Sequence, residues 1–258
     1  MKRRLHRLFR ENGKIFILAM DHGGSLNVLP ELKDTGKTIK ECVDGGVDAF
    51  LTTFGIATTY KEEIGRAGII LRLDGATSQL GPENGTTRQI FSVEDAVKIG
   101  ADGIVCMGFP GSASEETSLT SLSKFVSDAY TWGMPLVAEM LPMGWNTGAW
   151  TPENIAFACR LGAEYGADII KTQYTGDKES FRKVVEGCYK PVVILGGPGD
   201  ASERELLTMI KDSLEAGGRG VAIGRSIWKH PAPGKYCRAI AKIIHEGASV
   251  EEALRELA

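Results

Sequence analysis

The stretch GADIIKT, residues 166–172, gives the strongest indication of the fold. A glycine turn leads at once into a short apolar run, and the same outline returns in GGVDAFL (45–51), GADGIV (100–105) and GGRGVAI (217–223). Glycine adopts the left-handed conformation that closes a helix, so each copy looks like a helix end that feeds a strand. A helix–turn–strand unit repeated in this way predicts a parallel α/β sheet.

Eight short runs rich in valine, isoleucine and leucine extend this pattern along the chain, at 15–20, 48–53, 69–73, 103–107, 135–140, 168–172, 191–195 and 220–224. Most do not alternate between apolar and polar residues, as expected for strands buried on both faces. Eight strands in 258 residues favour closure into a (β/α)₈ TIM barrel, with one domain over residues 1–258. The alternative is an open doubly wound sheet, but no GxGxxG motif follows the first strand.

Helix start signals lie between several of these strands. Thr151-Pro152 places a capping hydroxyl before a first-turn proline. Ser92, Ser202 and Ser249 each precede an acidic residue by three positions, the spacing of a capping box.

Composition limits the class of protein. The formal net charge of −3 argues against broad nucleic-acid binding. The basic N-terminus precedes an apolar run (15–20) that is too short for a signal-peptide core or a membrane span. Leu5, Leu8 and Phe9 share one helical face, so we expect a short amphipathic helix there. Five scattered cysteines with no CxxC pair or metal-ligand spacing predict reduced thiols, a cytoplasmic protein and no metal site.

Lys171 points most directly to chemistry, because it lies inside the apolar strand at 168–172. Burial disfavours the charged form of a lysine, and a neutral amine can attack a carbonyl to form a Schiff base. The alternative is a lysine that pairs with a barrel carboxylate or reaches water at the rim.

Other candidates lie at the carboxyl ends of the strands, where barrel active sites form. Asp21, Asp74 and Glu139 are candidate acids or bases, and each could instead orient the lysine or cap a loop. Asp21 is favoured because it directly follows an apolar strand and precedes a glycine turn. Tyr174 could donate a proton and His22 could bind substrate, although both residue types also pack in loops.

A phosphate site is predicted after the last two strands. Gly196-Gly197 and Gly224 let backbone N–H groups approach an anion, and such loops hold phosphate in many of these barrels. Arg225 adds a fixed positive charge.

The stretches DHG (21–23), ADIIKTQYTGD (167–177), GGP (196–198) and GRSIW (224–228) resemble one family. It comprises the archaeal-type class I fructose-bisphosphate aldolases and relatives such as 2-amino-3,7-dideoxy-heptulosonate synthase and a thiolase acting on phosphorylated autoinducer-2. The resemblance implies a TIM barrel, Lys171 as the Schiff-base lysine, Asp21 close to it, and a phosphorylated sugar as substrate. It also implies a cofactor-free enzyme that assembles as a pentamer or decamer.

One departure from the family stands after the fifth strand. The aldolases carry a catalytic tyrosine in a Tyr-Pro-Arg-Gly motif, whereas this chain reads Leu141-Pro142-Met143-Gly144. Leucine cannot move a proton. Glu139 lies two residues earlier, on the same side of the strand, and could take the role.

The sequence therefore predicts a class I aldolase that cleaves or forms a carbon–carbon bond in a phosphorylated ketose or deoxy-sugar. Two alternatives stay open. The first is an acyl-transfer enzyme, like the thiolase, that uses the same lysine on a phosphorylated diketo sugar. The second is a non-catalytic sugar-phosphate binder. The expected catalytic residues are Lys171, Asp21, Glu139 and Tyr174, and the expected substrate- or phosphate-binding residues are Gly196, Gly197, Gly224, Arg225, Asp74 and His22.

Overall fold

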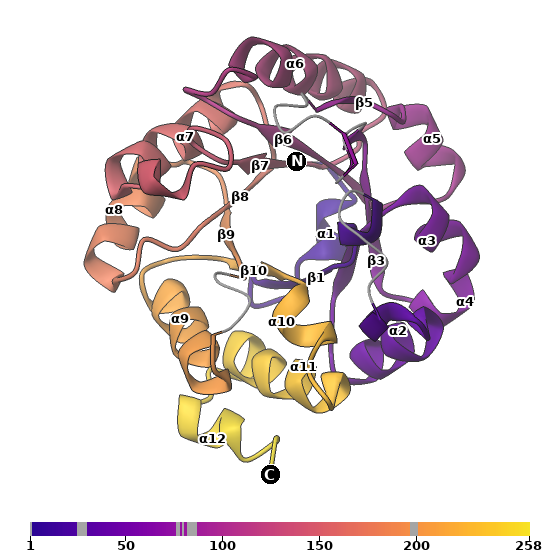
Figure 1. Cartoon of the computed structure of the whole chain (residues 1–258), viewed down its shortest axis with the longest axis vertical. Helices are drawn as coiled ribbons and strands as arrows, with labels where there is room; N and C mark the ends of the chain where they lie inside the picture. The colour runs from indigo at the N-terminus through magenta and orange to yellow at the C-terminus, as the bar shows by residue number, and fades with distance from the viewer. Residues whose placement is uncertain (1, 25–29, 76–77, 79, 82–86, 197–200) are drawn as a thin grey trace.

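Eight parallel strands close into a barrel in the computed structural model, which describes residues 2–24, 30–75, 78, 80–81, 87–196 and 201–258 (Figure 1). The strand order around the barrel is β1-β10-β9-β8-β7-β6-β3-β2. This confirms the predicted (β/α)₈ TIM barrel, and the eight predicted strands agree with the observed ones to within one residue or two. They are β1 (Ile15–Ala19), β2 (Ala49–Thr52), β3 (Gly68–Arg72), β6 (Gly103–Gly108), β7 (Leu136–Met140), β8 (Ile169–Thr172), β9 (Val192–Leu195) and β10 (Gly220–Ile223).

Helices form the outer layer around these strands (Figure 1). They are α2 (Thr35–Asp44), α3 (Phe54–Thr59), α4 (Lys61–Ile64), α5 (Val93–Lys98), α6 (Glu115–Thr131), α7 (Pro152–Glu164), α8 (Lys178–Gly187), α9 (Glu203–Glu215), α10 (Arg225–Trp228), α11 (Pro233–Ala241) and α12 (Val250–Leu254). Short 3₁₀ turns form η1 (His22–Gly24), η2 (Pro30–Leu32) and η3 (Thr147–Ala149), and a π-helical turn forms η4 (Lys242–Glu246). Outside the barrel, β4 (Asp74–Gly75) pairs antiparallel with β5 (Arg88–Gln89). Among the helices of these described ranges, none is long and apolar enough to cross a membrane.

The predicted helix starts are confirmed. Ser92, Ser202 and Ser249 each form a complete capping box at the start of α5, α9 and α12. The Thr151 hydroxyl accepts a hydrogen bond from the backbone of Asn154, and Pro152 opens α7. These caps satisfy N–H groups that a helix leaves unpaired, so local sequence fixes where the outer layer begins.

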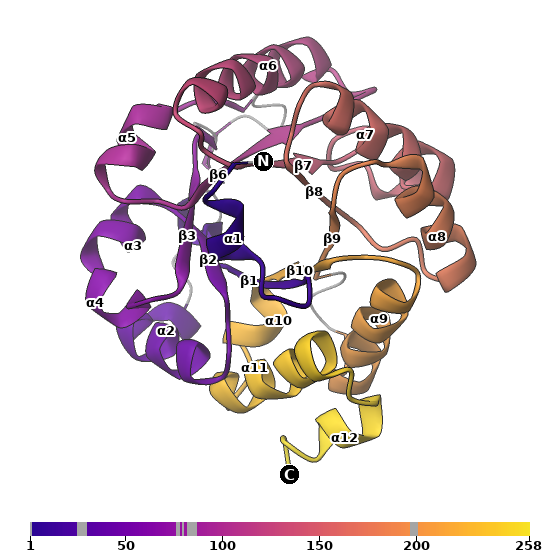
Figure 2. The same cartoon turned by 180° about the vertical axis from the view of Figure 1, so that it is seen from behind.

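An apolar column fills the inside of the barrel and is closed at its N-terminal end by α1 (Leu5–Leu8). Leu8 is fully buried in this column, and Leu5 and Phe9 pack against it. Figure 2 shows α1 lying over this end of the barrel. The expected amphipathic helix at the N-terminus is therefore confirmed, and its apolar face is the floor of the barrel interior.

Three aspartates at the amino ends of strands bind the basic side chains of the N-terminal segment. They are the aspartates of three of the repeated turns, at positions 48, 102 and 168. Each also accepts a hydrogen bond from the first residues of a neighbouring strand, through the backbone N–H of Phe16, Ile69 and Leu136. The repeat thus joins neighbouring strands to each other and to the segment that covers them. The ion pairs are Lys2–Asp168 (2.8 Å), Arg7–Asp102 (3.2 Å) and Arg10–Asp48 (2.5 Å).

Candidate active site

A charged layer covers the apolar column at the carboxyl ends of the strands. Side chains alternate along a strand, so the interior residues of β3, β7 and β8 are followed two positions later by Arg72, Glu139 and Lys171. Each of these three residues is only 5% exposed. Buried charges are costly unless they are paired, so the contacts among them determine their state.

Lys171 and Glu139 form a direct ion pair, with 2.7 Å between Nζ and Oε1. The two residues are partners in the register of β8 and β7, which places their side chains side by side. Burial alone would raise the pKa of the Glu139 carboxyl, but the charges of Lys171 and Arg72 lower it to about 2. Glu139 is therefore ionised in the resting protein, and Lys171 is its partner. This is the paired arrangement that the sequence left open as an alternative for this lysine.

Arg72 is a central residue that the sequence analysis missed. Its guanidinium binds Asp21 at 2.8 Å, Glu139 at 2.5 Å and Asp74 at 3.2 Å. Burial works against its charge, but these three carboxylates hold the pKa of Arg72 well above its usual range. The signal was present, since an arginine inside the apolar run 69–73 is as unusual as the lysine inside 168–172.

The structure gives Asp74 a different place from the one expected. Its side chain is 1% exposed, and it accepts hydrogen bonds from Arg72, from the Thr87 hydroxyl at 3.1 Å and from the Met107 backbone at 2.8 Å. Burial raises its pKa, and the contact with Arg72 opposes that shift. With its oxygens engaged by protein donors, Asp74 orients Arg72 and is not positioned to bind a substrate.

Asp21 and His22 lie together where β1 ends, with 3.7 Å between Asp21 Oδ1 and His22 Nδ1. Burial lowers the pKa of His22. The negative charge of Asp21 raises this pKa, whereas the positive charges of Lys171 and Arg225 lower it further. His22 therefore lies close enough to sense both the buried lysine and Arg225, and it is neutral at pH 7. Its ring packs edge-on against Trp228 of α10, with 5.7 Å between centroids.

The predicted phosphate residues are only partly described. Gly196 follows β9, Gly224 and the exposed Arg225 follow β10, and Gly197 lies outside the described residues. A Cβ on Gly224 would stand 2.2 Å from the carbonyl oxygen of Ala19 and 2.9 Å from the His22 ring. No larger residue fits there, so β10 meets β1 closely and Arg225 is brought to the mouth of the barrel next to His22.

Comparison with known proteins agrees with this geometry. A family model described as "DeoC/LacD family aldolase" matches residues 15–230. The chain belongs to the DeoC/LacD family of aldolases.

Two relatives of this aldolase match it over nearly their whole lengths. It is 38% identical to the 2-amino-3,7-dideoxy-D-threo-hept-6-ulosonate synthase of Halobacterium salinarum, covering 97% of this chain and 94% of the relative. It is 34% identical to the class 1 fructose-bisphosphate aldolase of Thermoproteus tenax, covering 96% of each. A solved archaeal fructose-1,6-bisphosphate aldolase, with its catalytic lysine bound to the carbinolamine intermediate, superposes with a TM-score of 0.85 at 31% identity, covering 94% of this chain and 98% of that one. The protein is a class I aldolase, an enzyme that works through a Schiff base.

The loop after β7 has apolar residues, Leu141 and Met143, at the two positions where the family motif has tyrosine and arginine. Leu141 is fully buried and donates its backbone N–H to the carbonyl of Gly108 at 2.9 Å. Met143 has a φ of 57°, a left-handed conformation that is uncommon for a side chain other than glycine. The aldolase thus presents an apolar side chain at this strand end, and the acid nearest to it along β7 is Glu139.

Tyr174 does not join the charged layer. Its ring packs against Phe181 of α8, with 5.2 Å between centroids, within the cluster between the strands and the outer helices. Burial, together with Asp212 and Asp177, raises the pKa of Tyr174 to about 12. The phenol lies among the outer helices of the aldolase, so the structure does not bring this predicted proton donor together with the lysine.

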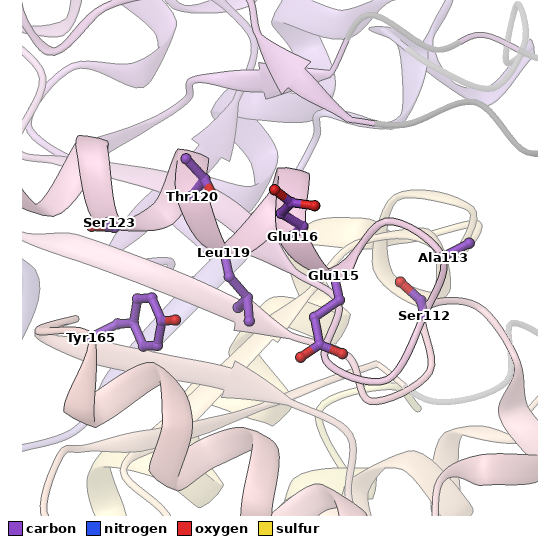
Figure 3. Close-up of a pocket in the computed structure, with 8 residues that line it drawn as sticks. All are labelled: Ser112, Ala113, Glu115, Glu116, Leu119, Thr120, Ser123 and Tyr165. Carbon is purple, nitrogen blue, oxygen red and sulfur yellow. The ribbon is translucent and has the colours of Figure 1, made fainter.

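A groove of about 590 Å³ lies on the outside of the aldolase, between the start of α6 and Tyr165 at the end of α7 (Figure 3). Glu115 and Glu116 line it, and Glu115 accepts a 2.6 Å hydrogen bond from the backbone of Gly111. The groove contains none of the residues of the charged layer. The candidate active site is therefore the mouth of the barrel and not this groove.

Proposed function

We propose that this class I aldolase cleaves or forms a carbon–carbon bond in a phosphorylated ketose or deoxy-sugar, through an imine at Lys171. The observation that carries the proposal is the buried ion pair between Lys171 Nζ and Glu139 Oε1, on top of the apolar column. An amine at this depth meets a carbonyl away from bulk water, and a carboxylate 2.7 Å away can remove its proton.

Glu139 is the acid/base group of the reaction in this proposal. It takes over the part of the tyrosine that Leu141 replaces. Leu141 directly follows β7, and its N–H still bonds the carbonyl of Gly108 on β6, so it faces the same way as the residue two positions earlier. Asp21 binds the same Arg72 nitrogen as Glu139 and is the second carboxylate, suited to hold or deprotonate a substrate hydroxyl.

The phosphate of the substrate binds to Gly196, Gly197, Gly224 and Arg225 at the mouth of the barrel. Arg225 begins α10, and its charge influences His22 next to the charged layer. In this proposal the substrate reaches from Arg225 to Lys171, and His22, on which both of these charges act, is a neutral hydrogen-bonding group beside it.

A second candidate function is acyl transfer on a phosphorylated diketo sugar with the same lysine. The observation that favours it is Leu141, because the thiolase relative also lacks the tyrosine. Membership of an aldolase family counts against the third reading, a non-catalytic sugar-phosphate binder.

The test is a panel of phosphorylated ketoses and their unphosphorylated analogues, each incubated with and without sodium borohydride. We expect carbon–carbon cleavage of at least one phosphorylated ketose, and inactivation by borohydride only when that substrate is present. Turnover that requires an acyl acceptor such as coenzyme A would identify the second function. Equal turnover of the unphosphorylated analogue would contradict the phosphate site.

Assembly and location extend the proposal. Phe157 on α7 is 61% exposed and Tyr189 after α8 is 56% exposed, with Arg160 lying 5.0 Å over the Tyr189 ring. Exposed aromatic side chains with an arginine are typical of protein interfaces, and they support assembly into a homo-oligomer. The resemblance to the family makes that oligomer a pentamer or a decamer. The five buried, unpaired cysteines support a reducing, cytoplasmic location. Light scattering of the wild type and of Phe157→Glu tests the assembly.

A further inference from the structure

The arginine that joins the carboxylates of the charged layer has a task that the proposed function does not assign. Arg72 is 5% exposed and is held on three sides by Asp21, Asp74 and Glu139. Because its donors are occupied by protein oxygens, it is not free to bind a phosphate or a substrate carboxylate. Its effect on the reaction must pass through the groups that it touches.

The geometry divides the two oxygens of Glu139 between two cations. Arg72 holds Oε2 at 2.5 Å, and Lys171 binds Oε1 at 2.7 Å. Asp74 accepts a hydrogen bond from Arg72 through Oδ1. Its other oxygen, Oδ2, accepts hydrogen bonds from the Thr87 hydroxyl and the Met107 backbone, which hold Asp74 and therefore Arg72 in place. The carboxylate therefore cannot rotate away from the lysine without breaking a buried charged hydrogen bond.

We propose that Arg72 is a positioning residue that makes Glu139 Oε1 a relay for the protons released from Lys171 while the imine forms. This rests on the proposed imine at Lys171. In the first step Nζ gives one proton to Oε1 and forms its bond to the carbonyl carbon. The carbonyl electron pair moves to the oxygen, which takes that proton and becomes the carbinolamine hydroxyl.

In the second step a further proton of Nζ travels through Oε1 to the hydroxyl, which leaves as water. The lysine ends as an iminium ion with one hydrogen on nitrogen, and Glu139 ends as a carboxylate again. Three hydrogens on the ammonium thus become one on the iminium and two on water, and the net charge of the pair is unchanged. No metal, cofactor or redox partner is required.

Arg72 suits Glu139 to this relay because it keeps the carboxyl strongly acidic. Desolvation opposes ionisation of Glu139, and the charges of Lys171 and Arg72 lower its pKa to about 2 in the resting pair. When the lysine has given up its proton, the charge of Arg72 still lowers the pKa of Glu139 and favours transfer of the proton from Oε1 to the departing oxygen. The titratable or charged groups that face Glu139 are Lys171 from β8, Arg72 from β3, His22 after β1 and the Cys106 thiol of β6. Burial raises the pKa of Cys106 well above its usual range, and His22 is neutral, so Arg72 is the cation that stays on Glu139 when the lysine loses its charge.

The experiment is the pH dependence of kcat/KM and of borohydride trapping for the wild type, Arg72→Lys and Arg72→Met. Without Arg72 the pKa of Glu139 rises, so at acid pH the free enzyme already holds a proton on Oε1 and cannot accept one from Lys171. We expect the acidic limb of kcat/KM to move up by about one pH unit or more in Arg72→Met, the usual effect of one close opposite charge. Arg72→Lys should lie between Arg72→Met and the wild type.

Three further variants separate the loss of the Arg72 charge from indirect effects. Arg72→Met leaves Asp74 buried without its cation, so Arg72→Met combined with Asp74→Asn is measured beside Asp74→Asn alone. Arg182→Met, on the outer face of α8, is the matched control and should keep the wild-type profile. A folded double variant whose acidic limb stays at the wild-type pH overturns the role of Arg72. Absence of a borohydride adduct in the wild type would instead refute the proposed imine.

Discussion

The two ends of this barrel both carry buried or half-buried acids and bases, but they arrange them differently. At the amino ends of the strands each of three aspartates has one basic partner from the N-terminal segment, and Arg7 and Arg10 keep 72% and 46% of their side chains exposed. At the carboxyl ends three carboxylates share Arg72 and one of them also binds Lys171, and none of these five side chains is more than 13% exposed. Separate, partly exposed pairs can tie elements together, whereas a shared buried set couples the protonation of every member.

Lys2 and Lys171 are the sharpest comparison between the two ends, because each forms one ion pair of nearly equal length, 2.8 Å and 2.7 Å. Lys171→Met should reduce turnover by about a thousandfold or more while the protein stays folded, since the covalent step is lost. Lys2→Met should leave kcat/KM within about twofold of the wild type. Steady-state kinetics with circular dichroism measures both. A similar loss in the two variants would show that the two ends do not differ in role.

Within the mouth, Glu139→Gln tests the acid/base role of Glu139 in forming the imine and in the steps that follow. The variant should give the borohydride adduct more slowly than the wild type, because Oε1 no longer relays the protons of Lys171, and it should lose carbon–carbon cleavage by about a hundredfold or more, the usual scale of general acid–base catalysis. Single-turnover kinetics with trapping at timed intervals measures the two steps. Cleavage near the wild-type rate would mean that the proton travels through Asp21 or a bound water.

Arg225→Ala should have a smaller effect, confined to binding. Its contact with a remote phosphate is similar in the ground and transition states, so KM should rise by about tenfold with little change in kcat. The matched control is Arg182→Met on the outer layer, which should change neither constant. A fall in kcat with an unchanged KM would place Arg225 among the groups that act on the reacting atoms.

Asp48→Asn tests the amino end, where the expected effect is on stability alone. Asp48 binds Arg10, the backbone of Phe16 at 2.6 Å and His245 at 2.9 Å. Loss of its charge should lower the free energy of unfolding by about 1–3 kcal/mol, the range for buried hydrogen bonds to charged groups. Urea denaturation gives this value, and kcat should remain that of the wild type. A variant of normal stability but low kcat would contradict the division between the two ends.

The same comparison explains what the sequence could predict. The eight strands, the capping boxes at Ser92, Ser202 and Ser249, and the position of Lys171 follow from local patterns that the barrel does not override. Arg72 was missed because its run was interpreted only as a strand, although a charge in an apolar strand was the signal used for Lys171. An equal treatment of both strands would have found it.

Two assignments depended on directions that the sequence does not fix. Alternation places Glu139 and Lys171 on the inner face, but β8 ends at Thr172, so the rule no longer gives the direction of Tyr174. Asp74 lies just past β3 in the separate β4–β5 pair, where its oxygens meet the Thr87 hydroxyl and a backbone amide of β6. Neither contact can be derived from spacing, because both join segments that are distant in the chain.

The central claim is that Lys171 is the amine that reacts. The most direct test is mass spectrometric mapping of the wild-type enzyme after reduction with borohydride in the presence of a cleaved phosphoketose. The account predicts a single modified lysine, in the peptide that contains residues 166–177, and no adduct on Lys2 or Lys178. An adduct on any other lysine, or activity that borohydride does not block, would contradict it.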